Sequence, residues 1–170
     1  MLFLDPKTGK YVEEFATSNF AALTAPDATG NRTYVTPKSS SVLPSVTNRS
    51  LLELSSLHFG WNVERRPVEW SEVVNGAFNE IAACGTAVVI TPIGNIDRQI
   101  PIYENKSIAK KSLNQIWDDS DERPVSFDIE AVALATEFSG FKQLYDTYRG
   151  IQTGNFPDTY GWMYPSEGLC

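Results

Sequence analysis

The most informative stretch of this 170-residue sequence is Ser41-Val42-Leu43-Pro44-Ser45-Val46-Thr47-Asn48-Arg49, which precedes a run of leucines at helical spacing. We expect a helix that stops at Gly60 and has Thr47 or Asn48 as its N-cap, since either side chain can accept a hydrogen bond from the first turn. A helix start offers free N–H groups and the positive end of the helix dipole. This position is therefore a candidate anion site, to which the Thr47 hydroxyl adds a donor. Capping alone would equally explain a threonine here.

Short strands are expected on both sides of this helix. Before it, β-type segments separated by Pro- or Gly-containing turns lie at residues 2–4, 11–15, 19–23 and 33–36. After it, we expect a strand at 62–66, a short helix from about Ser71 to Gly76, and two strands within 80–92. This alternation of strands and helices predicts a mixed α/β (α+β) domain.

The last third of the sequence has a different pattern. We expect one helix at residues 108–117, an acidic stretch at 118–124, a second helix at 129–152 interrupted near Gly140, and an irregular tail. The predicted organisation is therefore a core at residues 1–117, an acidic insertion or irregular segment at 118–141, and a closing helix and tail at 142–170.

Composition narrows the class of protein. Hydrophobic residues make up 42% of the chain, enough for a buried core, and the length fits one domain. The formal net charge of −7 argues against nucleic acid as a partner, because duplex binding needs a basic surface. No apolar run approaches the roughly 20 residues of a membrane helix, so no membrane partner is expected. Cys84 and Cys170 lack metal-type spacing, so we expect no metal and a reduced intracellular compartment.

Two further segments carry groups that suit a ligand. Gly85-Thr86-Ala87 separates two apolar strands, and the glycine allows close approach of another group, although a tight strand connection is the alternative. Glu13 and Glu14 are neighbours in an apolar strand, whose period of two sends them to opposite faces. A carboxylate that faces the interior needs a partner, whereas a curled edge strand would leave both in water. For His58, the single histidine, we expect a partner of the C-terminal helix dipole or a surface role.

Taken in order, these segments resemble the C-terminal domain of the branched-chain aminotransferases, a family of class IV, fold type IV pyridoxal-phosphate enzymes. The matching stretches are residues 3–5, 11–14, Thr17-Ser18-Asn19-Phe20, 41–49, 85–87, Thr91-Pro92, Leu144-Tyr145, 150–154 and Gly161-Trp162. The resemblance covers roughly residues 2–117 and 142–164. It implies the large pseudo-barrel domain of fold type IV enzymes.

The resemblance implies that four residues bind the cofactor, pyridoxal 5'-phosphate. Glu14 falls where the family places the carboxylate that pairs with the pyridine nitrogen, which makes the ring an electron sink. Val46, through its backbone N–H, and Thr47 fall where the phosphate is held at a helix start. Thr86 matches a second phosphate donor.

The resemblance also implies the substrate contacts and the reaction. The N–H groups of Thr86 and Ala87 match those that orient the substrate α-carboxylate, and Thr17 lies where the family lines the substrate pocket. The implied reaction moves an amino group between a hydrophobic amino acid and a 2-oxo acid such as 2-oxoglutarate. The context would be amino-acid biosynthesis or secondary metabolism, and the full-length family implies a homodimer.

Other parts of the family pattern do not match this sequence. The Schiff-base lysine and a phosphate-binding arginine belong to a domain upstream of the stretch that begins at Phe3. We therefore expect no catalytic residue in this chain and little activity from it alone, since Lys7 and Lys10, in or beside a turn, are poor substitutes. Ser45 and Ala16 stand where the family commonly has glycine.

Two other functions stay open on the sequence. The chain fits a non-catalytic truncated relative that acts as a binding or dimerisation partner or as a pseudo-enzyme. It also fits a module that binds another phosphorylated small molecule at the same helix start. The compartment, cytoplasmic or mitochondrial, is likewise open.

Overall fold

The computed structural model of the chain describes residues 1–102, 126–134 and 137–163. Two compact units are present: one contains residues 1–94 together with the chain from residue 134 onward, and the other contains residues 95–133. Within the described residues, no helix is both long enough and apolar enough to span a membrane.

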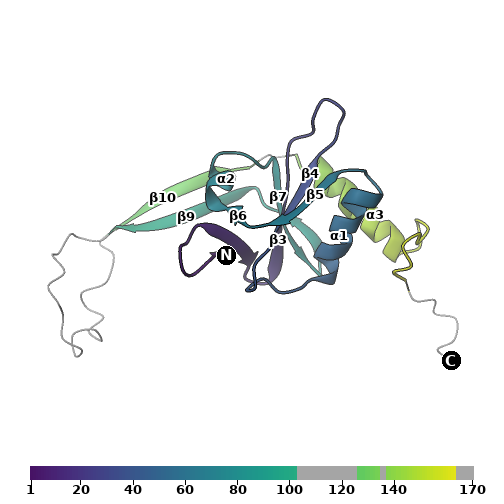
Figure 1. Cartoon of the computed structure of the whole chain (residues 1–170), viewed down its shortest axis with the longest axis horizontal. Coiled ribbons are helices and arrows are strands. Elements are labelled where there is room, and N and C mark those ends of the chain that lie inside the picture. The colour runs from purple at the N-terminus through teal and green to yellow at the C-terminus, as the bar shows by residue number, and fades with distance from the viewer. Residues whose placement is uncertain (103–125, 135–136, 164–170) are drawn as a thin grey trace. The chain divides into compact units, whose positions relative to one another are not determined.

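An eight-stranded sheet, counted over the described residues, forms the centre of the first unit (Figure 1). Its main path runs through β1 (Leu2–Leu4), β2 (Tyr11–Phe15), β3 (Ser18–Leu23), β4 (Thr33–Pro37) and β5 (Asn62–Arg66). β6 (Val68–Glu69) pairs with β2, while β7 (Glu80–Gly85) pairs with both β3 and β8 (Val89–Pro92). These strands confirm, to within one residue at their ends, those expected before residue 93.

The helices of the first unit complete the mixed α/β architecture. β4 and β5 are the parallel pair, and α1 (Val46–Leu57) is the crossover that such a pair requires. α2 (Trp70–Val74) is the short helix expected near Ser71, and α3 (Ser139–Gln152) follows later in the chain. α1 and α3 lie side by side (Figure 1). Their apolar faces enter one core with the sheet, which includes Leu51, Leu54, Phe141, Leu144, Leu23, Tyr34 and Ala82.

The start of α1 differs from the expectation. Ser45 is the N-cap, and its Oγ accepts a hydrogen bond from the Asn48 backbone N at 3.1 Å, so the prediction of Thr47 or Asn48 is wrong. The Asn48 side chain is not available as a cap because its amide is used by β4: it accepts from the Tyr34 hydroxyl at 2.6 Å and donates to Thr36 Oγ1 at 2.8 Å.

The second unit is an antiparallel strand pair, β9 (Asn95–Ile102) and β10 (Ser126–Ala133). The helix predicted over residues 129–152 is therefore wrong for its first five residues, and α3 covers only the later part. Polar and apolar residues alternate from Asp128 to Glu130, a period of two that suits a strand once β9 supplies the hydrogen bonds. The helix expected at 108–117, the acidic stretch at 118–124 and the boundary at 117 lie outside the described residues.

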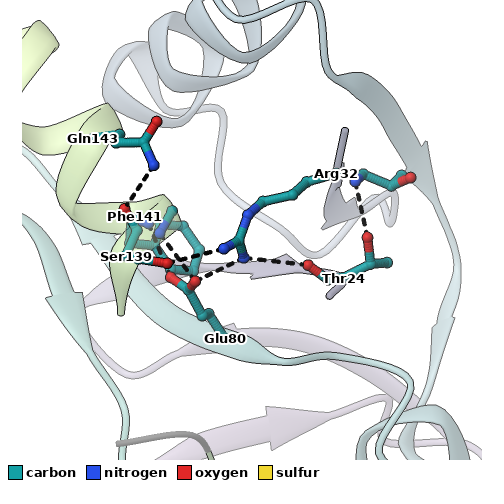
Figure 2. Close-up of polar contacts among 8 residues, drawn as sticks. Thr24, Arg32, Glu80, Ser139, Phe141 and Gln143 are labelled. Carbon is teal, nitrogen blue, oxygen red and sulfur yellow. Dashed lines mark hydrogen bonds and ion pairs between the residues drawn. The ribbon is translucent and has the colours of Figure 1, made fainter. Parts of the chain in front are cut away.

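A buried ion pair joins α3 to the sheet. The Glu80 carboxylate, at the start of β7, accepts hydrogen bonds from Arg32 Nη1 at 2.8 Å and from the backbone N atoms of Gly140 and Phe141 at 3.0 and 2.9 Å. Arg32 also donates to Ser139 Oγ at 2.9 Å (Figure 2). Glu80 thus satisfies free N–H groups in the first turn of α3, where a negative charge is favoured by the helix dipole.

Candidate functional site

Glu14 is tied to the segment that leads into α1. Glu14 and Asn19 are opposite each other in the β2–β3 pair. Glu14 Oε2 accepts hydrogen bonds from Asn19 Nδ2 at 3.0 Å and from the Leu43 backbone N at 3.3 Å. Leu43 belongs to residues 41–45, here called the α1 entry loop, which ends at the N-cap Ser45. The carboxylate on β2 and the start of α1 are therefore parts of one connected site.

The start of α1 keeps hydrogen-bond donors available. Among the described residues, the backbone N–H groups of Val46 and Thr47 have no acceptor, whereas that of Asn48 is taken by Ser45. The Thr47 side chain is 3% exposed, and within the described parts of the chain its hydroxyl makes no hydrogen bond. Two amides and one hydroxyl at the positive end of a helix form a donor set suited to an anion.

The turn between β7 and β8 lies beside the segment that joins β2 and β3. In the β3–β7 pair, Asn19 is opposite Cys84. A Cβ placed on Gly85 would lie 3.5 Å from Ser18 Cβ and 3.8 Å from the Thr17 carbonyl oxygen, so the two backbones approach closely at this point. Thr17, Thr86 and Ala87 are all exposed.

The turn also contains strained backbone. Val89, which pairs with Gly85 across the β7–β8 hairpin, has a φ of 67°, a value that a β-branched residue rarely adopts. Its side chain is buried, which helps to hold this conformation. Cys84, the residue before Gly85, is buried, and burial raises the pKa of its thiol to about 12. Cys84 therefore packs as a small, uncharged residue.

The structure brings together only some of the six residues that were predicted to bind cofactor or substrate: Glu14, Thr17, Val46, Thr47, Thr86 and Ala87. Glu14 connects to the α1 entry loop by hydrogen bonds, and Thr17 lies against Gly85 through the β3–β7 pairing. Within the described residues, no hydrogen bond joins Thr86 or Ala87 to Glu14 or to the start of α1. A cavity of about 420 Å³ is lined by Asn19 and the α1 entry loop, and none of the six residues lines it.

The sequence alone assigns no role to the side chain of Asn19. Asn19 lies in the Thr17-Ser18-Asn19-Phe20 stretch, which matches the family. The signal in the sequence is a carboxylate and an amide on two neighbouring β-type segments, 11–15 and 19–23, which a short turn separates.

Comparison with known proteins places these features in context. No family model matches the sequence. The chain is 35% identical over 163 residues to a branched-chain-amino-acid aminotransferase of Helicobacter pylori, a match that covers 96% of this chain and 37% of the relative. It is 41% identical over 167 residues to aminotransferase poxL of Penicillium oxalicum, again covering 96% of this chain and 37% of the relative. The chain therefore spans about two fifths of the length of these relatives.

Solved structures show the same fold. The branched-chain aminotransferase of Escherichia coli superposes with a TM-score of 0.62 at 19% identity, covering 95% of this chain and 41% of the other. The branched-chain aminotransferase of Thermobaculum terrenum in its PLP form gives a TM-score of 0.56 at 22% identity, covering 91% and 38%. The fold of this chain is therefore that of part of a fold type IV enzyme. In sequence and in fold, the chain matches part of a class IV branched-chain aminotransferase.

Proposed function

We propose that this chain is the cofactor-holding portion of a branched-chain-type aminotransferase, which moves an amino group between a hydrophobic amino acid and 2-oxoglutarate. The observation that carries the proposal is the hydrogen bond from Leu43 N to Glu14 Oε2. It connects the carboxylate assigned to the cofactor's ring nitrogen with the loop that enters the proposed phosphate site. The aminotransferase names of the relatives support the reaction class.

The chemistry of the available groups fits pyridoxal phosphate. A protonated ring nitrogen needs an acceptor, and Glu14 Oε1 has no hydrogen-bond partner among the described residues. A phosphate needs donors, and the N–H groups of Val46 and Thr47 with the Thr47 hydroxyl supply them. When bound, the cofactor supplies an electron sink for the charge that develops at the substrate α-carbon.

The turn after β7 is proposed to contact both ligands. The Thr86 hydroxyl donates to the cofactor phosphate, and the backbone N–H groups of Thr86 and Ala87 hold the substrate α-carboxylate, a group that adjacent amides bind well. Thr17, beside Gly85, lines the substrate side.

We assign no Schiff-base lysine within the chain. Lys7 and Lys10 belong to the turn organised by Asp5, which accepts hydrogen bonds from both backbone N atoms, and both side chains are exposed. We propose that the lysine comes from outside these 170 residues and that the chain alone does not complete amino transfer. Homodimerisation and a cytoplasmic or mitochondrial location stay predictions.

Equilibrium dialysis of the full chain against pyridoxal phosphate and against inorganic phosphate tests the proposal. Thr47→Val removes the hydroxyl with little change of shape, and we expect about tenfold weaker binding of both ligands, the effect of one charge-assisted hydrogen bond. Glu14→Gln should weaken binding of pyridoxal phosphate only. Glu13→Gln changes the neighbouring carboxylate, which faces Ser39 instead, and serves as the matched control.

Three outcomes would contradict parts of the proposal. Absence of pyridoxal phosphate binding by the unaltered chain would favour the non-catalytic partner. Equal competition by nucleotides would favour a site for another phosphorylated molecule. Turnover of leucine with 2-oxoglutarate by this chain alone would show that the assignment of the lysine to another segment is wrong.

A further inference from the structure

Asn19 is buried at the centre of the connected site. Its side chain is 4% exposed, and it lies opposite Glu14 on one side of β3 and opposite Cys84 on the other. A buried side-chain amide has two donor hydrogens and one acceptor oxygen to satisfy. Its hydrogen-bond partners therefore indicate which groups it holds in place.

The orientation of the Asn19 amide is fixed by its neighbours. Nδ2 donates to Glu14 Oε2 at 3.0 Å and to the Leu43 carbonyl oxygen at 3.1 Å. Exchange of the nitrogen and oxygen would set Oδ1 against a carboxylate and a carbonyl, neither of which can donate. Both donors of the amide are therefore used to hold Glu14 and the α1 entry loop together.

The arrangement treats the two oxygens of Glu14 differently. Oε2 accepts from Asn19 and from Leu43 N, whereas among the described residues Oε1 accepts from neither. A carboxylate held through one oxygen has a fixed rotamer, and the other oxygen then points in one direction for a ligand.

Asn19 also carries an unmet hydrogen-bonding requirement. Its Oδ1 is buried and has no hydrogen-bond partner within the described residues. The residue also lines the cavity of about 420 Å³ beside the α1 entry loop. An unpaired buried acceptor costs about 1–3 kcal/mol, so an amide retained here serves a purpose that an apolar residue would not.

We propose that Asn19 is a positioning residue, which fixes Glu14 through Oε2 to the α1 entry loop and so presents Oε1 to the ring N–H of the cofactor. The inference rests on the proposed function. It predicts that the group that holds the cofactor's ring nitrogen and the groups that hold its phosphate keep fixed positions relative to each other. The reason is that Leu43 and the donors of Val46 and Thr47 belong to one continuous segment.

The test follows the protonation of the ring nitrogen directly. Pyridoxal phosphate labelled with ¹⁵N in the ring is bound to the full chain, and its nitrogen chemical shift is recorded as the pH is raised. We expect the unaltered chain to hold the proton to a higher pH than free cofactor does. Asn19→Leu, of similar size and without hydrogen bonds, should lower this midpoint by about one pH unit and weaken cofactor binding about tenfold. Binding of inorganic phosphate should change less than about twofold.

Glu13→Gln is the matched control, because it changes the neighbouring carboxylate, whose partner is Ser39 instead of Asn19. Asn19→Ser, which keeps one donor, should give an intermediate midpoint. If Asn19→Leu does not fold, the side-chain amide signals of Asn19 in the unaltered chain give a second test. They should shift on addition of pyridoxal phosphate and stay unchanged with inorganic phosphate.

The outcomes separate the two proposals. A midpoint that falls in Glu14→Gln but is unchanged in Asn19→Leu overturns the role of Asn19 and leaves the proposed function intact. Unmoved Asn19 amide signals in a chain that binds the cofactor overturn it as well. Failure of the unaltered chain to bind pyridoxal phosphate overturns the proposed function, and this inference with it.

Discussion

Arg32 and Glu80 form an ion pair between two almost fully buried side chains that lie 48 positions apart in the sequence. Two buried charges are favourable only when their remaining donors and acceptors are also satisfied. Here the guanidinium also reaches Ser139 and lies 6.0 Å from the Trp61 ring centre, and the carboxylate accepts two N–H groups of α3. The pair therefore joins α3, β7 and the segment before β4.

Replacing Glu80 should strongly destabilise the first unit. In Glu80→Ala the Arg32 charge is left buried without its counter-ion and α3 loses its acceptor, so we expect a loss of about 3–5 kcal/mol in the free energy of unfolding. Urea denaturation followed by circular dichroism measures it. Glu53→Ala is the control, because the Arg49–Glu53 pair is exposed and worth about 1 kcal/mol or less. Equal effects of the two variants would show that burial does not set the strength of the pair.

Gly140→Ala should destabilise the chain although alanine is the better helix former. A Cβ at this position would lie 2.6 Å from Leu23 Cδ1 and 3.2 Å from Glu80 Oε1. We expect a loss of about 1–3 kcal/mol from overpacking, opposite in sign to the gain of up to about 1 kcal/mol from helix propensity. Gly94→Ala, where a Cβ meets nothing within 4 Å, is the comparison. A higher melting temperature for Gly140→Ala would refute the close contact with Leu23.

Asp5 should contribute stability that disappears in acid. The Thr8 hydroxyl, followed by the Tyr11 backbone N–H, holds the pKa of this carboxyl well below its usual 3.8. A pKa that is lowered by folding stabilises the native state above the unfolded value, and this contribution is lost as pH falls through the folded value. The stability difference between the unaltered chain and Asp5→Asn should therefore be largest near neutral pH and shrink below pH 3.8.

Thermal melts over a pH series measure this difference. Thr8→Val, which removes the hydroxyl that lowers the Asp5 pKa most, should reproduce part of the effect. A difference that grows as the solution is acidified would contradict the direction of the pKa shift.

The Cys84 thiol should be unreactive in the native chain. Burial raises its pKa to about 12, so in mildly alkaline buffer it is protonated and shielded, whereas the thiolate is the reactive form. In a Cys170→Ser background, a disulfide reagent should modify Cys84 only after unfolding in urea. Rapid modification without denaturant would mean that the β7 end of the sheet opens readily.

The sequence was most informative where local signals act. Turn residues and β-rich segments predicted the strands up to β8 except the two-residue β6, and the helix stop at Gly60 agrees with the end of α1. The errors came from long-range pairing: Asn48 is not the cap because Tyr34 and Thr36 take its side chain. Likewise, Ile129 is in a strand because β9 pairs with it at Gln99. The role of Asn19 depends on its hydrogen bond to the Leu43 carbonyl oxygen, 24 positions away in the sequence, which no local signal predicts.

Gly94 and Leu134, the residues of the first unit that flank the second unit in the sequence, are hydrogen-bonded to each other. Gly94 O accepts a hydrogen bond from Leu134 N at 3.1 Å, so the chain leaves the first unit and returns to it at adjacent positions. A segment with neighbouring ends can change in length, or be replaced by a short connector, without moving the residues on either side. Evolution and protein engineers alike have, between Gly94 and Leu134, a place to lengthen or shorten the polypeptide.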